Sequence, residues 1–205
     1  MLELWLVRHA ETLWNAERRI QGQSDTPLSG RGLAQAERLA QRLKGTHFDR
    51  LYSSDSRRAL HTAEIALGGR AVQPEPRLRE MSYGTLEGKA RAELAGTERE
   101  AFTVYWHDPY KVALPGGESW RELDARVFAW LRTLPAEGRV AAFSHGGTIR
   151  SALFYVTGIP RKREWNVLFG NTSLTRLRLG KVNTVVSVND TAHLIATGLE
   201  DDGES

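Results

Sequence analysis

Three short segments of the 205-residue chain follow apolar runs and carry side chains that can handle a phosphate group: Arg8-His9, Ser53 to Arg58, and Ser144-His145. A neutral imidazole can attack phosphorus and hold the phosphoryl group as a phosphohistidine. Arginine suits bidentate contact with phosphate oxygens and stabilises the charge that they carry in the transition state. The three segments together therefore predict a phosphoryl-transfer site with His9 as its nucleophile.

The charges expected around His9 agree with that role. Positive charge from Arg8 and Arg58 disfavours imidazolium and would keep His9 neutral. His145 would be a second donor to the phosphoryl oxygens, and the start of a helix just before Arg58 would add backbone N–H groups. Taken singly, His9 could be a core histidine, the arginines surface ion-pair partners and His145 a turn residue. The conjunction favours the functional interpretation.

Hydrophobic patterning predicts the elements that would position these residues. Residues 2–7, 48–53 and 140–143 have the apolar character of buried strands, and alternation after residue 176 predicts a late hairpin turning at Gly180-Lys181. Helical spacing predicts helices over about 31–44, 54–67, 89–108, 119–133 and 148–156, with Ser53, Ser54 or Asp55 as the N-cap of the second.

Strands that alternate with helices, followed by a hairpin, predict an α/β fold: a three-layer sandwich with a mostly parallel mixed central sheet flanked by helices and a C-terminal hairpin added. Ligands of such sheets gather at the carboxyl ends of the strands. Arg8-His9, Ser53 to Arg58 and Ser144-His145 all follow predicted strands. We therefore expect them to meet at one edge of the sheet.

The chain also resembles a known family over nearly its whole length. Its segments 8–15 (RHAETLWN), 53–63 (SSDSRRALHTA), 78–88, 115–119 (PGGES) and 144–147 (SHGG) are similar, in order, to the motifs of the histidine phosphatase superfamily, the phosphoglycerate mutase-like proteins. Each motif is weak alone, but five in order at plausible spacing are highly specific. The resemblance implies a phosphatase of this family.

The resemblance also implies roles for particular residues. His9 takes the phosphoryl group, Glu80 protonates the leaving oxygen and then helps water attack, and the phosphate is bound by Arg8, Arg58 and His145. By the same resemblance, the substrate-binding residues are Asn15, Gln21, Gly22 and Gly146. It implies a metal-independent phosphomonoester hydrolase of the histidine acid phosphatase type, with no cofactor and a small phosphorylated metabolite as substrate.

Three positions depart from the family pattern. Ala10 replaces the usual glycine after the nucleophile, which excludes a need for positive φ there. Ser56 and His61 replace the usual leucine and glutamine of the second motif, at positions that we interpret as packing positions. We expect His61 to pack on its helix and His47 and His107 to be exposed.

Other functions remain open at the level of sequence. A cofactor-dependent phosphoglycerate mutase would use the same residues, but such mutases are usually longer between the Glu80 region and the second histidine. A non-catalytic phospho-ligand binding module need not keep both the nucleophile His9 and the acid Glu80. A zinc hydrolase is disfavoured because the chain has no HExxH or His-x-His spacing.

Composition sets broad limits. The 28 basic and 25 acidic residues give a net charge of only +3, and the basic residues are scattered, so no nucleic-acid partner is expected. The chain has no cysteine and no apolar run near the roughly 20 residues of a membrane span. We expect a cytoplasmic protein without a membrane partner, and a homodimer stays open.

The length predicts one domain over residues 1–205, with a cap that decides substrate specificity at about 81–120 and a frayed acidic tail at about 200–205. Aromatic residues are frequent in the cap. Tyr83 and Tyr105 could stack on a substrate or pack the cap, whereas the spacing favours core positions for Trp106 and Trp120.

Overall fold

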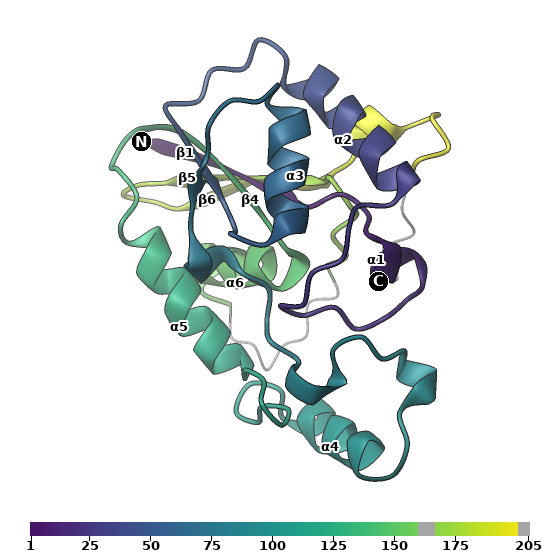
Figure 1. The fold of residues 1–205 in the computed structure, drawn as a ribbon. Coiled ribbons are helices and arrows are strands. Elements are labelled where there is room, and N and C mark those ends of the chain that lie inside the picture. Colours follow the sequence, from purple (N-terminus) through teal and green to yellow (C-terminus); the bar gives the residue numbers. More distant parts are fainter. Residues whose placement is uncertain (160–166, 201–205) are drawn as a thin grey trace.

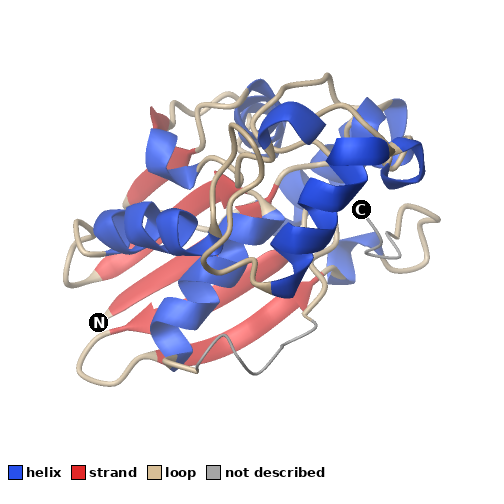
Figure 2. Ribbon diagram, turned by 90° about the horizontal axis from the view of Figure 1, so that it is seen from below, coloured by secondary structure: helices blue, strands red, loops and turns tan. Residues whose placement is uncertain are grey.

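The computed structural model describes residues 1–159 and 167–200 of the chain. Within them, six strands form one mixed sheet in the order β3-β2-β4-β1-β5-β6. The first four of that order run parallel, whereas β5 pairs antiparallel with β1 and β6 antiparallel with β5. Figure 2 shows the strands as one continuous layer with helices packed across it. The strands are β1 (Leu2–Arg8), β2 (Arg50–Ser53), β3 (Gln73–Pro74), β4 (Gly138–Ser144), β5 (Leu174–Leu179) and β6 (Thr184–Asp190).

The helices cover both faces of this sheet (Figure 1). The α-helices are α1 (Leu13–Ala16), α2 (Gly30–Leu43), α3 (Arg57–Ala66), α4 (Gly96–His107), α5 (Trp120–Leu131) and α6 (Gly146–Thr157). Short 3₁₀ turns occur at Pro76–Leu78, Gly84–Leu86, Arg91–Glu93 and Ala192–Leu194. The predicted α/β sandwich with a mixed sheet and a C-terminal hairpin is confirmed.

The central strand β1 explains why two helical layers form. Leu4 and Leu6 point into the core shared with α5 and α6, whereas Trp5 and Val7 point into the core shared with α2 and α3. All four side chains are buried. A strand that is apolar on both faces must be covered on both, which is typical of parallel sheets.

Serine caps fix the starts of two of the covering helices. The Ser29 hydroxyl accepts the N–H of Gly32 at the start of α2. Ser119 and Glu122 form a capping box at the start of α5. Helix α3 differs, because its N-cap residue is Ser56 rather than Ser53, Ser54 or Asp55, and the Ser56 side chain makes no capping bond.

The segment predicted as a cap is less helical than its pattern indicates. Helix α4 begins only at Gly96, after a 3₁₀ turn at Arg91–Glu93. Tyr105 is buried and Trp120 packs against the main core, but Trp106 is 62% exposed and stacks on Phe102, so its predicted core position is wrong. Because α4 packs on the rest of the protein through few residues, helical spacing alone did not reveal which face is covered.

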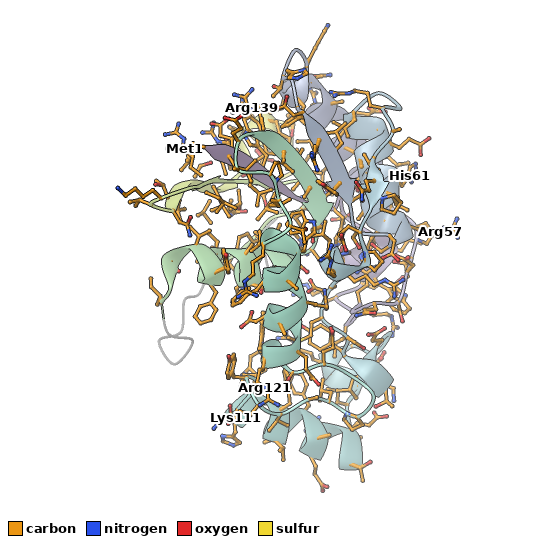
Figure 3. The ribbon with its side chains drawn as sticks, turned by 90° about the vertical axis from the view of Figure 1, so that its left-hand side faces the viewer. Met1, Arg57, His61, Lys111, Arg121 and Arg139 are labelled. Carbon is orange, nitrogen blue, oxygen red and sulfur yellow. The ribbon has the colours of Figure 1, made fainter. Side chains whose placement is uncertain are left out.

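Two smaller expectations are corrected. The hairpin does not turn at Gly180-Lys181 alone, because β5 ends at Leu179 and β6 begins at Thr184, and Val182 is 74% exposed. His61 does not pack on α3 but is exposed, as Figure 3 shows. The predicted frayed tail from residue 201 onward lies outside the described residues. Within the residues described, no helix combines the length and apolar character needed to cross a membrane.

Candidate active site

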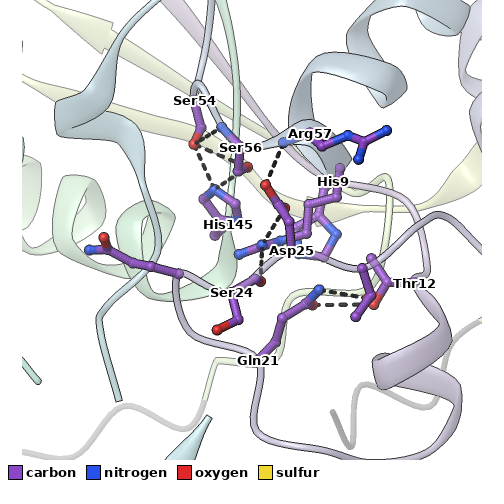
Figure 4. A network of polar contacts seen from close by, with 12 residues as sticks. His9, Thr12, Gln21, Ser24, Asp25, Ser54, Ser56, Arg57 and His145 are labelled. Atoms are coloured by element: carbon purple, nitrogen blue, oxygen red, sulfur yellow. Dashed lines mark hydrogen bonds and ion pairs between the residues drawn. The ribbon is translucent and has the colours of Figure 1, made fainter. Parts of the chain in front are cut away.

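The carboxyl ends of β2, β4 and β1 lie side by side because these strands are neighbours and parallel. The backbone N–H of His9 donates to the carbonyl of Ser144 at 2.9 Å, and that of Ser54 donates to the carbonyl of Phe143 at 2.8 Å. The imidazole rings of His9 and His145 are 5.1 Å apart between centroids. The predicted meeting of the three segments at one sheet edge is confirmed (Figure 4).

The structure fixes which nitrogen of His9 can react. Its Nδ1 lies 2.8 Å from the carbonyl oxygen of Ala10, which can only accept, so Nδ1 carries the proton and Nε2 keeps the lone pair. Burial, followed by the charges of Arg58 and Arg8, holds the pKa of His9 well below its usual range. His9 is therefore a neutral imidazole with its lone pair on Nε2.

Arg58 is almost completely buried, and a loop rather than a helix holds its guanidinium. One terminal nitrogen donates to the carbonyl of Ser24 at 2.8 Å and to the carboxylate of Asp25 at 2.9 Å, and the other donates to the carbonyl of Gly22 at 2.6 Å. Its Nε is buried without a hydrogen-bond partner in the described part of the chain. Of the five N–H donors of Arg58, the one on Nε and one on the second terminal nitrogen are thus left for a ligand.

The loop that holds Arg58 is itself held by Glu87. The Glu87 carboxylate accepts the backbone N–H of Gln23 at 3.0 Å and that of Ser24 at 2.8 Å. Gly22 has φ +57°, and a Cβ there would lie 2.2 Å from the carboxylate of Glu87. Glycine at 22 therefore allows both the left-handed turn and the close approach of the carboxylate.

Glu80 lies beside the start of α6. Its carboxylate accepts the N–H of Met81 at 2.7 Å and that of Gly147 at 3.0 Å. A Cβ on Gly147 would lie 2.2 Å from the same carboxylate, so the two residues are matched. Since Gly147 follows His145 by two residues, Glu80 reaches the sheet edge that carries both histidines.

Arg126 of α5 holds the backbone around Glu80. Its guanidinium donates to the carbonyls of Arg77 at 2.8 Å, Arg79 at 2.7 Å and Glu80 at 2.8 Å. It also forms a bidentate ion pair with Glu118, whose second oxygen accepts the N–H of Ser82. Arg126 and Glu118 together therefore fix the segment that contains Glu80 to helix α5.

Arg8 and His145 are the remaining buried residues among those predicted to bind the phosphate. Arg8 is 7% exposed and donates to the carbonyl of Phe169. His145 is fully buried, and burial followed by the charge of Arg58 holds its pKa well below the usual range. Its Nε2 lies 2.9 Å from the hydroxyl of Ser54, whereas its Nδ1 has no hydrogen-bond partner among the described residues.

The residues expected to bind substrate have different surroundings. The side-chain oxygen of Asn15 accepts the N–H of Thr12 in a capping box of α1. The amide of Gln21 accepts from the hydroxyl of Thr12 at 3.2 Å and donates to that of Thr26 at 3.1 Å. Gly146 is the first residue of α6, and nothing lies within 4 Å of where its Cβ would be. Contact of these residues with a phosphate stays a prediction.

Four residues of the network had no role in the sequence reasoning: Asp25, Glu87, Glu118 and Arg126. Each of them binds at least one backbone group, and such contacts give little signal in the residue type. The one available signal was position, since Glu87 and Glu118 lie inside the motifs, whereas Asp25 lies between the first two. In the parts of the chain that the structure describes, no three His, Cys, Asp or Glu side chains are grouped so that they could hold a metal ion.

Known proteins resemble this chain in sequence and in structure. Residues 4–191 match the family model described as histidine phosphatase superfamily (branch 1). A probable phosphoglycerate mutase of Yersinia pestis (strain Pestoides F) is 36% identical over 98% of the chain and 99% of its own length.

Two solved structures are similar over most of their length. A putative alpha-ribazole-5'-P phosphatase from Escherichia coli has a TM-score of 0.86 at 26% identity, covering 93% of this chain and 97% of its own. A phosphoserine phosphatase mutant from Entamoeba histolytica, in complex with phosphoserine, has a TM-score of 0.78 at 29% identity, covering 95% and 100%.

Proposed function

The chain belongs to branch 1 of the histidine phosphatase superfamily, and on that premise we propose that it is a metal-independent phosphomonoester hydrolase acting through a phosphohistidine. One observation carries the proposal. A neutral His9 with a free Nε2 lies beside two buried nitrogens, Nε of Arg58 and Nδ1 of His145, that have no hydrogen-bond partner in the described chain. Buried polar atoms are nearly always paired, so this set suits an anionic ligand.

In the first step, Nε2 of His9 attacks phosphorus and the bond between phosphorus and the ester oxygen breaks. Arg8, Arg58 and His145 bind the three equatorial oxygens, where charge accumulates. Donors of this kind are typically worth about 3–4 kcal/mol each in the transition state. The departing oxygen takes a proton from Glu80, which leaves an alcohol and a phosphohistidine.

In the second step, a water molecule attacks the phosphohistidine. Glu80, now a carboxylate, takes a proton from this water, and the bond between nitrogen and phosphorus breaks to release inorganic phosphate. The N–H groups of Met81 and Gly147 hold the Glu80 carboxylate at the start of α6, beside both histidines. The lone pair returns to Nε2 of His9, and the proton on Nδ1 stays there throughout, donated to the carbonyl of Ala10.

Four further residues and the class of substrate form part of the same proposal. Asn15 and Gln21 would contact phosphate oxygens, and Gly146 would offer its backbone N–H at the start of α6. Gly22 would shape the loop that holds the guanidinium of Arg58, because its carbonyl accepts from that group. The substrate would be a small phosphorylated metabolite in the cytoplasm, in keeping with the small phosphate esters named for two similar structures.

A phosphoglycerate mutase is the second candidate, because a relative with that name is 36% identical over nearly the whole chain. A mutase would return the phosphoryl group from His9 to the substrate instead of to water. Incubation with 3-phosphoglycerate, with and without bisphosphoglycerate, separates the two. Release of free phosphate supports the phosphatase, and accumulation of the 2-isomer supports the mutase.

The proposal is tested with a generic aryl phosphate at mildly acidic pH in EDTA. We expect turnover that vanadate inhibits and that His9→Ala abolishes, with His61→Ala, an exposed histidine, as the matched control. Substantial activity in His9→Ala would overturn the nucleophile, and loss of activity in EDTA would instead indicate a metal.

A further inference from the structure

The chain is irregular where β5 begins, beside the candidate active site. Up to the pair of Val7 and Leu174, β1 and β5 form an antiparallel ladder (Figure 1). At Arg8 the pattern changes: its N–H donates to the carbonyl of Ser173 at 3.1 Å, but its carbonyl accepts from the N–H of Thr172 at 3.1 Å. Thr172 and Ser173 thus both lie opposite Arg8, which makes a β-bulge.

Thr172 is an unusual residue for the first position of such a bulge. The position has a left-handed backbone and is normally glycine, yet Thr172 has φ +59° and is fully buried. A β-branched residue in this conformation persists only where the surrounding structure fixes it. The Thr172 hydroxyl lies 2.9 Å from Nε2 of His193 and donates to the carbonyl of Asn171 at 2.7 Å. Backbone strain of this kind is concentrated at functional sites, and here it adjoins the strand end that carries His9.

The bulge brings the side chain of Asn171 to the carbonyl of His9. Nδ2 of Asn171 donates to this oxygen at 2.9 Å, and the N–H of Thr172 makes a longer contact with it at 3.3 Å. The same peptide group is held at its other end, because the N–H of Ala10 donates to the hydroxyl of Thr62 at 3.0 Å. The peptide between His9 and Ala10 is thus fixed by the bulge before β5 on one side and by α3 on the other.

The orientation of this peptide decides how the imidazole of His9 is held. The two dihedrals that flank the peptide, ψ of His9 and φ of Ala10, set where the carbonyl of Ala10 lies relative to the ring. That carbonyl lies 2.8 Å from Nδ1 of His9 and keeps the proton there, which leaves the lone pair on Nε2. A rotation of the peptide would therefore move the ring and loosen the contact that selects its tautomer.

We propose that Asn171 is a positioning residue for phosphoryl transfer, whose amide holds the peptide between His9 and Ala10 so that Nε2 of His9 keeps its lone pair and its aim at phosphorus. The inference rests on the proposed function, because it takes His9 as the nucleophile. Asn171 acts through the backbone of His9, whereas the guanidinium of Arg58 is held by residues 22–25. We therefore expect Asn171 to affect the attack on phosphorus more than the binding of phosphate.

The kinetic test is Asn171→Ala with a generic aryl phosphate. A displacement of about 1 Å costs on the order of 100-fold in rate, so we expect kcat to fall by about 10- to 100-fold. KM and the affinity for inorganic phosphate should change far less. The matched control is Asn183→Ala, in the exposed turn between β5 and β6, which should keep the native kcat. Should Asn171→Ala fold poorly, Asn171→Ser keeps a turn-forming polar residue whose hydroxyl ends one bond short of the amide nitrogen.

The state of the His9 ring gives a second readout, which a purely structural role would not move. NMR of protein with ¹⁵N-labelled histidine rings reports the tautomer, with the His9 signals assigned by their loss in His9→Gln. We expect the native protein and Asn183→Ala to have Nδ1 protonated and Nε2 unprotonated. Asn171→Ala should show a mixture of the two tautomers.

Two results would overturn the inference. One is an Asn171→Ala protein with the native kcat, and the other is an Asn171→Ala protein with native His9 ring signals, since any fall in kcat would then have another cause. Failure of the phosphatase proposal looks different. In that case the native protein would not hydrolyse the aryl phosphate, whereas the His9 ring signals would still respond to Asn171→Ala.

Discussion

At the scale of single residues, the charge of Arg58 adds to burial in lowering the pKa of both His9 and His145. After burial, its charge is the largest cause that lowers the pKa of His9, and the same holds for His145. The ordinary pKa of histidine is 6.5, and the pKa of His9 lies well below it. His9 is therefore mostly neutral at pH 6.5. The proposed nucleophile is therefore available at mildly acidic pH.

Replacement of Arg58 by methionine should raise the pKa of His9, because a buried positive charge is removed while an apolar stem remains. We expect the acid limb of kcat/KM to move to higher pH, in addition to a large fall in kcat. Ring ¹⁵N titration of His9 in both proteins measures the shift directly. Arg57→Met, at an exposed neighbour, is the control. An unchanged His9 midpoint in Arg58→Met would contradict the assignment of charge as a cause.

Glu87 gives a second prediction at this scale. Its carboxylate accepts N–H groups of Gln23, Ser24 and Tyr83 at once, so Glu87→Ala leaves three part-buried donors without this acceptor. We expect a loss of about 1–3 kcal/mol in the free energy of unfolding. KM for an aryl phosphate should rise because the loop that holds Arg58 loosens.

Denaturant unfolding and steady-state kinetics check this, with Glu64→Ala, an exposed glutamate on α3, as the control. A Glu87→Ala protein with native KM would show that the loop does not depend on this carboxylate.

At the scale of elements, the sequence predicted what local patterns encode. Alternation and helical spacing located β1, β2, β4, α2 and α5, and the order of strands and helices brought His9, Arg58 and His145 to one edge. The pattern could not identify the group that caps α3. The N–H of Arg57 is accepted by the carboxylate of Asp25, which lies 32 residues earlier in the chain. Nor could it place Trp106, since the same helical spacing fits a covered and an exposed face.

Helix α5 supplies the element-scale prediction. Arg126 donates to three carbonyls in the segment that carries Glu80, so it fixes where the acid lies. Arg126→Ala should lower kcat more than it raises KM, and should lower Tm. Arg126→Lys keeps the charge but not the planar fork, so it should recover only part of the loss.

The control for Arg126 is Arg121→Ala, at an exposed position on the same helix (Figure 3). If Arg126→Ala and Arg121→Ala had equal kcat, the role of α5 in holding Glu80 would be refuted.

At the scale of the whole molecule, two cores share one sheet. Leu4 and Leu6 of β1 belong to the core under α5 and α6, and Trp5 and Val7 of the same strand belong to the core under α2 and α3. Neither core can open without exposing one face of the central strand. The cores should therefore unfold together, which is also what the predicted single domain requires.

Truncation of one core residue on each face tests this coupling. Leu39 of α2 and Leu123 of α5 are both fully buried, on opposite faces. We expect Leu39→Ala and Leu123→Ala each to cost about 2–5 kcal/mol and to shift the whole urea transition without splitting it. Far-UV circular dichroism and tryptophan fluorescence should give coincident curves in both variants. Val182→Ala, at a residue 74% exposed, should leave the midpoint unchanged. A transition that splits in only one variant would mean that the two faces of the sheet fold as separate units, because each truncation would then act on its own core alone.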